Sequence, residues 1–305
     1  MSTPEAASAR ALDPALLMRL KGLHLRARTV VEGVLSGIHR SPHHGSSVEF
    51  SEHQEYSPGD ELRLIDWKLY GKTDRLYVKR YEHETNLRAT LLVDATRSMS
   101  YVGRDGISKW DYARTAAASL AWLLLGQGDA VGVARFGDGI DGFVPPRADR
   151  GHLNALLNEL EEHIPAGCGT AAAAALALLE RLPARGLVVI LTDALEPVEP
   201  LARSLRLLRS RRHDVCLIQV LHQDEVDFPF EGLLRFASLE DAREFLADGR
   251  EARAAYLAAF ARHERELSDA ALAQGIDRLR LATGEPLDRG LVRWLAARER
   301  RHSAA

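Results

Sequence analysis

The chain has 305 residues, enough for one large α/β domain with a smaller attachment. Its formal net charge of −3 lacks the basic excess that would indicate nucleic acid as a partner. Two cysteines without metal-ligand spacing are typical of reduced thiols and predict a cytoplasmic protein. The N-terminus does not resemble a secretory signal, and the longest apolar stretches fall well short of the roughly 20 residues that cross a bilayer. We therefore expect no direct membrane insertion.

The first part of the chain predicts a tail, a helix and a small β-rich unit. Residues 1–15 are rich in Ala, Ser and Pro and predict a flexible tail. Residues 16–34 carry apolar side chains at helical spacing and predict a helix. Around the turn Ser57-Pro58-Gly59-Asp60 lie short β-prone segments at residues 48–56, 62–67 and 76–81. We therefore expect residues 16–86 to form an N-terminal helix and a β-rich leader unit.

From residue 87 onward, strand and helix patterns alternate. We expect strands at Arg88–Asp94, Ala130–Phe136, Ile140–Val144, Leu187–Thr192, Val215–Leu221 and Asp277–Ala282. We expect helices at Trp110–Gly126, His152–Ile164, Ala171–Leu182, Val198–Arg212, Glu251–Gln274 and Leu287–Arg298. The rhythm breaks around residues 224–248, where a hairpin is expected. Residues 87–305 thus predict a doubly wound, mostly parallel sheet flanked by helices, with a hairpin insertion.

Oxygen-bearing side chains gather where this sheet is expected to end. Asp94, Thr96 and Ser98 follow one strand, Asp193 follows another, and Thr170 opens a helix. Each alone is also an ordinary turn or N-cap residue. Together on one rim they suit a hard cation, Mg²⁺ or Mn²⁺, with Asp193 acting through water. We therefore predict a metal site at this rim.

The composition of the predicted site favours contact over catalysis. Neutral hydroxyl ligands leave a cation under-neutralised, so that it attracts an acidic side chain from a partner. The set lacks a placed base or nucleophile, and we expect the chain not to be an enzyme. One alternative is a Mg²⁺-dependent phosphohydrolase using Asp94, although Thr96 stands where haloacid-dehalogenase-like phosphatases have a second aspartate. Another is a structural module whose metal site is vestigial.

The order of these motifs resembles a known domain. Asp-x-Thr-x-Ser from Asp94, Gly-x-Gly-Thr ending at Thr170 and Leu-Thr-Asp ending at Asp193 resemble a von Willebrand factor type A domain with its metal-ion-dependent adhesion site. The resemblance implies Asp94, Thr96, Ser98 and Thr170 near the metal, with Asp193 bound through water. Thr96 stands where serine is usual, which keeps the oxygen and adds a methyl group.

The leader carries a second resemblance. Residues 49–67, together with residues 76–82, resemble the bacterial domain-of-unknown-function family numbered fifty-eight, and the resemblance extends over residues 30–300. Members pair this leader with a von Willebrand type A core and are often encoded beside MoxR-type AAA+ ATPases. The resemblance implies an adaptor or assembly partner of such an ATPase, with other von Willebrand type A proteins as further partners. Many relatives carry membrane-spanning helices ahead of this region, whereas the sequence predicts none here, so we do not expect membrane anchoring of this kind.

Overall fold

The computed structural model describes residues 12–39, 53–55, 77–79, 87–149, 151–183 and 185–302. The chain divides into two compact units, and residues 39–86 form the smaller one. Its described part is an antiparallel pair of short strands, β1 (His53–Glu55) and β2 (Tyr77–Lys79), with Gln54 opposite Val78. Both strands fall inside segments predicted to be β-prone, whereas the predicted segment at residues 62–67 lies outside the described residues.

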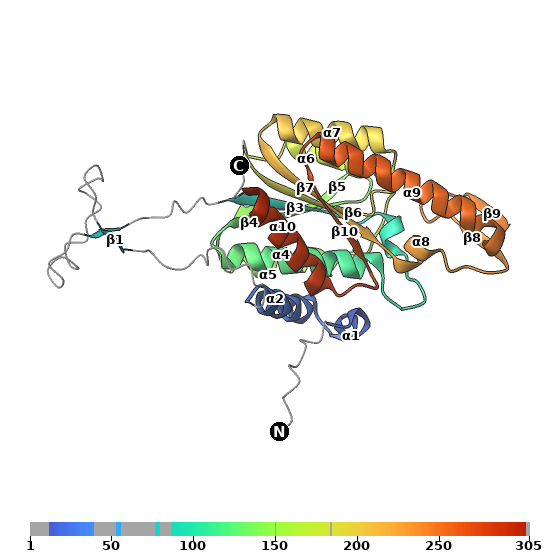
Figure 1. The fold of residues 1–305 in the computed structure, drawn as a ribbon, viewed down its shortest axis with the longest axis horizontal. Helices are drawn as coiled ribbons and strands as arrows, with labels where there is room; N and C mark the ends of the chain where they lie inside the picture. The colour runs from blue at the N-terminus through green and yellow to red at the C-terminus, as the bar shows by residue number, and fades with distance from the viewer. Residues whose placement is uncertain are drawn as a thin grey trace, which may run out of the picture. The chain divides into compact units, whose positions relative to one another are not determined.

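The larger unit is built on a mixed sheet of six strands (Figure 1). In spatial order the strands are β10 (Asp277–Ala282), β7 (His213–Leu221), β6 (Gly186–Thr192), β3 (Arg88–Asp94), β4 (Ala130–Phe136) and β5 (Ile140–Arg147). All neighbouring pairs are parallel except β4 and β5. This arrangement confirms the predicted fold class, a mostly parallel doubly wound sheet.

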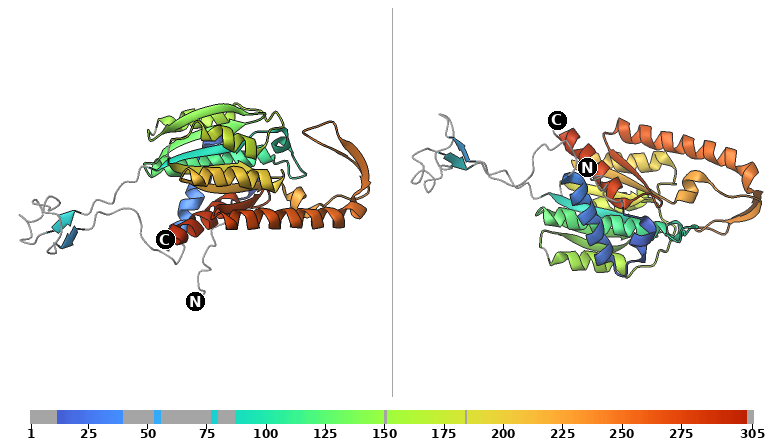
Figure 2. Two further views of the ribbon diagram at one scale, coloured as in Figure 1. Left: turned by 90° about the horizontal axis from the view of Figure 1, so that it is seen from above. Right: turned by 60° about the horizontal axis from the view of Figure 1, so that its bottom comes forward.

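Helices cover both faces of the sheet (Figures 1 and 2). One face packs against α4 (Lys109–Gly126), α5 (His152–Glu161) and α10 (Leu287–His302), and α1 (Pro14–Arg19) and α2 (Leu23–His39) join the core on this side. The other packs against α6 (Ala171–Leu179), α7 (Val198–Ser210) and α9 (Gly249–Ala273). Because both faces are covered, β3 is buried at every residue after Arg88, which explains its continuous apolar sequence.

The single helix predicted at residues 16–34 is two helices, a correction with a local cause. Leu20 has an extended backbone, and Gly22 has a φ of +85°, a conformation that glycine adopts without steric penalty. The first helix also begins inside the expected tail, because the Asp13 carboxylate caps it by accepting a hydrogen bond from Ala15 N at 2.9 Å.

The predicted boundary of the leader unit also needs correction. The N-terminal helices were grouped with residues 48–86, but their apolar faces belong to the core of the α/β unit. The buried residues that they contribute to that core are Leu17, Leu23, Ala27, Val30 and Val34. Burial of these side chains in that core fixes the two helices to the larger unit.

A hairpin interrupts the alternation, as predicted for residues 224–248. After the short helix α8 (Gln223–Asp227), strands β8 (Leu233–Ala237) and β9 (Glu244–Asp248) pair antiparallel, with Phe236 opposite Phe245. The chain then enters α9, the long helix beside the hairpin in Figure 1.

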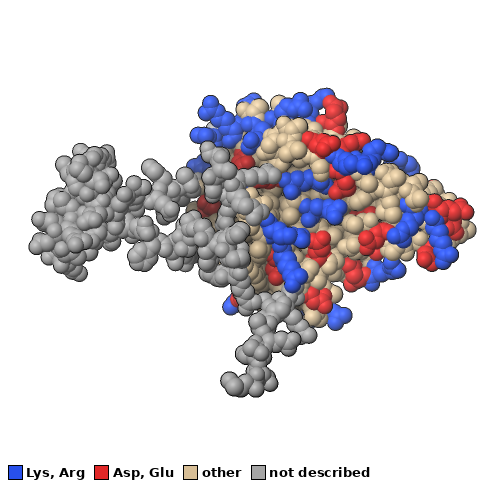
Figure 3. Space-filling view, viewed as in Figure 1, with Lys and Arg blue, Asp and Glu red and all other residues tan. Residues whose placement is uncertain are grey.

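The described surface carries mixed charge. On the face shown in Figure 3, Lys and Arg side chains lie among Asp and Glu side chains. Among the described residues, no helix combines the length and apolar character needed to cross a membrane.

The topology places an opening at the middle of the sheet. The connection after β3 runs through α4 on one face, and the connection after β6 runs through α7 on the other. Because β3 and β6 are neighbours, their carboxyl ends flank the point where the winding reverses. Doubly wound folds bind ligands at such points.

Candidate functional site

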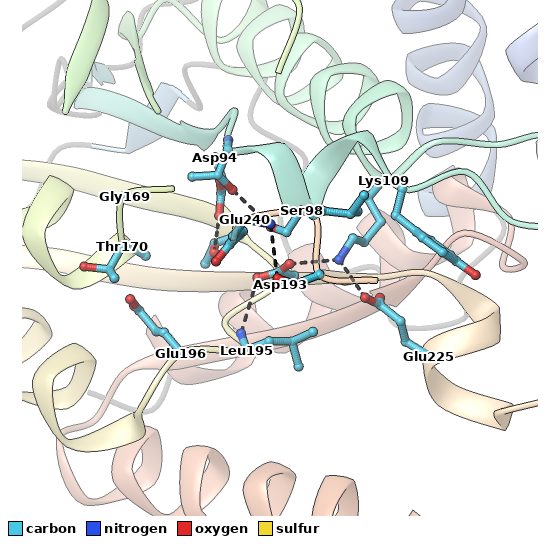
Figure 4. A pocket seen from close by; sticks show the side chains of 16 residues that line it. Asp94, Ser98, Lys109, Gly169, Thr170, Asp193, Leu195, Glu196, Glu225 and Glu240 are labelled. Atoms are coloured by element: carbon cyan, nitrogen blue, oxygen red, sulfur yellow. Dashed lines mark hydrogen bonds and ion pairs between the residues drawn. The ribbon is translucent and has the colours of Figure 1, made fainter. Parts of the chain in front are cut away.

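A pocket of about 250 Å³ opens at the carboxyl ends of β3 and β6 (Figure 4). All five residues predicted from the sequence line it: Asp94, Thr96, Ser98, Thr170 and Asp193. The fold therefore brings together, in one cavity, the three segments expected to meet. Further polar residues in its wall are Tyr101, Lys109, Glu196, Glu225 and Glu240.

The loop after β3 is organised around the Asp94 carboxylate, which is only 4% exposed. Its Oδ1 atom accepts hydrogen bonds from Thr96 N at 2.9 Å and from Thr96 Oγ1 at 2.6 Å. The hydroxyl oxygens of Thr96 and Ser98 are 3.0 Å apart. Because polar side chains alternate over Asp94, Thr96 and Ser98, one short turn brings together three side chains whose oxygen atoms could bind a metal.

Backbone contacts hold this loop against the segment that precedes α6. Ala95 and Ala166 are joined by an N–H···O bond of 2.8 Å, and Arg97 N donates to Gly167 O at 3.0 Å. Gly169 lies so close to the backbone after β4 that an added Cβ would stand 2.1 Å from Gly137 O. Only glycine fits there, so the Gly-x-Gly spacing before Thr170 is required by close backbone packing.

Thr170 caps α6, as its position in the sequence allowed. Its Oγ1 accepts a hydrogen bond from Ala173 N at 3.2 Å. Thr170 also lines the pocket, although its hydroxyl oxygen points away from Asp94 (Figure 4). Glu196, which the sequence did not single out, accepts from Ala172 N at 3.0 Å. Burial raises the pKa of Glu196 to about 7, against the opposing effect of its hydrogen bonds to Ala172 N and Thr170.

The end of β6 reaches the pocket through Thr192 and Asp193. Thr192 Oγ1 donates to Asp94 Oδ2 at 2.6 Å, so both carboxylate oxygens of Asp94 accept hydrogen bonds. The second carboxylate, Asp193, accepts from Leu195 N at 3.3 Å and is 6% exposed. The two aspartates predicted at the strand ends are therefore both buried at this rim.

An unpredicted lysine occupies the wall of the pocket. The Lys109 side chain is 1% exposed, and its Nζ lies 2.8 Å from Asp193 Oδ2 and 2.7 Å from Glu225 Oε1. Glu225 is fixed in turn, because its Oε2 accepts from His222 N at 2.7 Å. Burial alone would lower the pKa of Lys109, but the two carboxylates outweigh it and raise the pKa. This ammonium therefore neutralises Asp193 in the folded protein.

Because Lys109 pairs with Asp193 and Glu225, Asp94 has no counter-ion among the described residues. Among the described residues, no Lys, Arg or His lies within ion-pair distance of its carboxylate. Burial, followed by repulsion from Asp193, raises the pKa of Asp94 to about 7, although hydrogen bonds from Thr192 and Thr96 oppose this rise. The pKa of Asp193 shifts in the opposite direction. Burial raises it, but the Lys109 ammonium lowers it by more, so the net pKa of Asp193 is lowered.

These residues fit one hard divalent cation. Asp94 is a buried carboxylate that lacks a positive neighbour among the described residues, and Thr96, Ser98 and Thr170 line the same pocket. Each hydroxyl retains lone pairs beyond the hydrogen bonds it makes. No group of three or more His, Cys, Asp or Glu side chains in the described structure is placed to hold a metal alone. Hydroxyls would therefore supply most of the protein ligands, as expected for Mg²⁺.

Lys109 is the main residue that sequence reasoning missed, although a signal was present. It is the first residue of α4, where a positive charge is disfavoured by the helix dipole. It also stands one helical turn before Ala113 and two turns before Ala116, on the apolar face. Glu225 and Glu240 gave no such signal, because both lie in residues 224–248, where the alternation of predicted strands and helices is interrupted.

Comparison with known proteins decides the family. Residues 52–266 match the family model described as protein of unknown function DUF58. The chain belongs to the DUF58 family. A relative of this DUF58 protein, the uncharacterized protein Rv1480 of Mycobacterium tuberculosis, is 31% identical over 293 residues, covering 94% of this chain and 91% of the relative.

Two solved structures are similar to this DUF58 protein over part of its length. Conserved hypothetical protein BatB from Bacteroides thetaiotaomicron has a TM-score of 0.43 at 14% identity, covering 69% of this chain and 98% of that one. The SpRpn10 VWA domain has a TM-score of 0.39 at 10% identity, covering 68% of this chain and 94% of that one.

Proposed function

We propose that this DUF58 protein is a non-enzymatic protein-interaction module that binds Mg²⁺, or Mn²⁺, and thereby holds an acidic side chain of a partner. The observation that carries the proposal is the buried Asp94 carboxylate, which lines one pocket together with three hydroxyl residues, Thr96, Ser98 and Thr170, and lacks a cationic neighbour among the described residues. A site of this composition is stabilised when a hard cation enters it.

The charges of the pocket residues favour binding of an acidic group from a partner. Asp94, Thr96, Ser98 and Thr170 would hold the cation, and Asp193 would contact it through water. The bound cation supplies a positive charge that only Asp94 neutralises directly, because Asp193 is neutralised by Lys109. An acidic group from outside then completes the charge balance.

Local chemistry supports contact over phosphoryl transfer. Both oxygens of Asp94 accept hydrogen bonds, from Thr96 and Thr192, which makes the carboxylate a poor nucleophile. Thr96 has no ionisable group to serve as the general acid that the phosphohydrolase alternative requires. Turnover of phosphate esters that disappears in Asp94→Asn would contradict the non-enzymatic part of the proposal.

The partner that we propose is a MoxR-type AAA+ ATPase, with this chain as its adaptor or assembly factor. The chain's membership of the DUF58 family is what supports this pairing, through the association with such ATPases that the family resemblance implies. The proposal places the encounter in the cytoplasm, in keeping with the free thiols of Cys168 and Cys216.

Capture of a purified MoxR-type ATPase from the same genome tests the proposal. Because the ATPase itself needs Mg²⁺, the metal stays constant and the variants change. We expect Asp94→Ala to lose at least about tenfold in affinity, equivalent to about 1.4 kcal/mol. Asp269→Ala, an exposed acid on α9, should bind as the wild type does. Equal capture by the wild type and a folded Asp94→Ala protein would overturn the metal-dependent interaction.

A further inference from the structure

The turn of the β8–β9 hairpin reaches the candidate metal pocket. Ser238, Leu239 and Glu240 lie in its wall together with Asp94 and Thr170, although they belong to an insertion that is not part of the central sheet (Figure 4). The hairpin therefore places a carboxylate-bearing residue at a cavity whose other acids come from strand ends and helix starts.

Local hydrogen bonds fix the shape of this turn. Ser238 N donates to Arg243 O at 2.9 Å, closing the loop at its base. The Ser238 hydroxyl oxygen accepts from Glu240 N at 3.3 Å and from Asp241 N at 3.2 Å. These side chain to backbone contacts hold residue 240 at a defined place in the turn.

Aromatic packing holds the hairpin to α9. Phe228 stacks on Tyr256 of that helix with ring centroids 4.4 Å apart. Phe236 stacks between Phe228 and Phe245, at centroid distances of 5.8 Å and 5.3 Å. Such contacts each contribute about 0.5–1.5 kcal/mol beyond area burial. The hairpin is therefore anchored through Phe236, close to the turn that meets the pocket.

Glu240 differs from the other acids of the hairpin. The others have partners in ion pairs or in a helix cap: Glu231 with Arg250, Asp241 with Arg243, Glu244 with Arg235, and Asp248 at the start of α9. Within the described structure, the Glu240 carboxylate makes neither a hydrogen bond nor an ion pair. Glu240 is thus an acid at the pocket whose carboxylate is available to bind a cation.

The remaining glutamates of the pocket are already committed. Glu225 accepts from Lys109 and from His222 N, and Glu196 accepts from Ala172 N. Glu240 is therefore the pocket glutamate that can add negative charge toward a cation without breaking a contact seen in the structure. Because it belongs to the same chain, its effective concentration at the site is high.

We propose that Glu240 is an internal carboxylate ligand of the cation in this pocket, so that cation binding fixes the hairpin turn there. The inference rests on the proposed function, since it requires a cation at Asp94. It also defines a competition, because the hairpin and the acidic group of a partner seek the same charge. A partner would then have to displace Glu240 from the cation, and we call this contact of the hairpin turn the latch.

Two measurements on the full chain test the latch. Calorimetric titration with Mn²⁺ should show binding about tenfold or more weaker for Glu240→Gln than for the wild type. Glu244→Gln is the matched control, because it makes the same change at an exposed acid of the same hairpin. Hydrogen exchange of residues 233–248 should slow on adding Mn²⁺ in the wild type and in Glu244→Gln, but not in Glu240→Gln.

The outcomes separate the two levels of the proposal. Equal Mn²⁺ affinity in Glu240→Gln, with hairpin exchange unaffected by the metal in every variant, would overturn the latch and leave the metal site standing. A wild-type protein that binds no Mn²⁺ at millimolar concentration would overturn the latch and the proposed function together.

Discussion

Replacing Lys109 with methionine should lower the melting temperature of the metal-free protein by roughly 10 °C. The change leaves the 6%-exposed Asp193 without its counter-ion and also removes the ion pair of Glu225. Removing one partner of a buried ion pair costs about 3–5 kcal/mol, and each kcal/mol shifts the melting temperature of a unit this size by about 2–4 °C. Thermal denaturation at pH 7.5 in a chelating buffer measures the effect.

Two further variants isolate the cause. Lys21→Met makes the same substitution at an exposed lysine and should leave the melting temperature within about 1–2 °C of the wild type, as surface substitutions usually do. Adding Asp193→Asn to Lys109→Met should recover part of the lost stability, because position 193 then carries no unpaired charge, whereas Glu225 still lacks its ammonium partner. If Lys109→Met were as stable as Lys21→Met, Lys109 would not be the counter-ion of Asp193.

The pH dependence of stability should expose the buried Asp94 carboxyl group. Its pKa is about 7 in the folded protein, against an ordinary value of 3.8. Between these pH values the folded state retains a proton that the unfolded state releases, so this group's contribution to stability falls as pH rises from about 4 to about 7. The full shift corresponds to an upper limit of about 4 kcal/mol.

The Asp94→Asn variant removes that titration. In a chelating buffer, we expect the stability of the variant relative to the wild type to rise by up to about 4 kcal/mol between pH 4 and pH 7.5. Urea denaturation at both pH values gives the difference, with Asp269→Asn as the exposed control. Identical pH profiles for Asp94→Asn and the wild type would mean that the Asp94 carboxyl group has no raised pKa in the fold.

Residues at strand ends were predictable because topology follows from pattern. Asp94 and Asp193 follow apolar strands, and parallel strands of a doubly wound sheet present their carboxyl ends on one edge. Thr170 could be placed by its cap position and by the glycines before it. The convergence of these segments in one pocket therefore follows from local sequence patterns.

Other features depend on contacts between distant segments. The approach of Glu240 to Asp94 depends on how the hairpin packs on α9, which no local periodicity encodes. The N-terminal helices were misassigned for a similar reason, because an amphipathic pattern predicts a buried face without identifying what buries it. Lys109 was overlooked because a charged residue at a helix start is normally solvated.

Calorimetric titration of Mg²⁺ into the metal-free protein at pH 7.5 tests the candidate metal site most directly. We expect one site per chain in the wild type and in Asp269→Asn, with binding lost in Asp94→Asn. The absence of binding by the wild type up to millimolar Mg²⁺, or an unchanged affinity in a folded Asp94→Asn protein, would contradict a metal site at the carboxyl ends of β3 and β6.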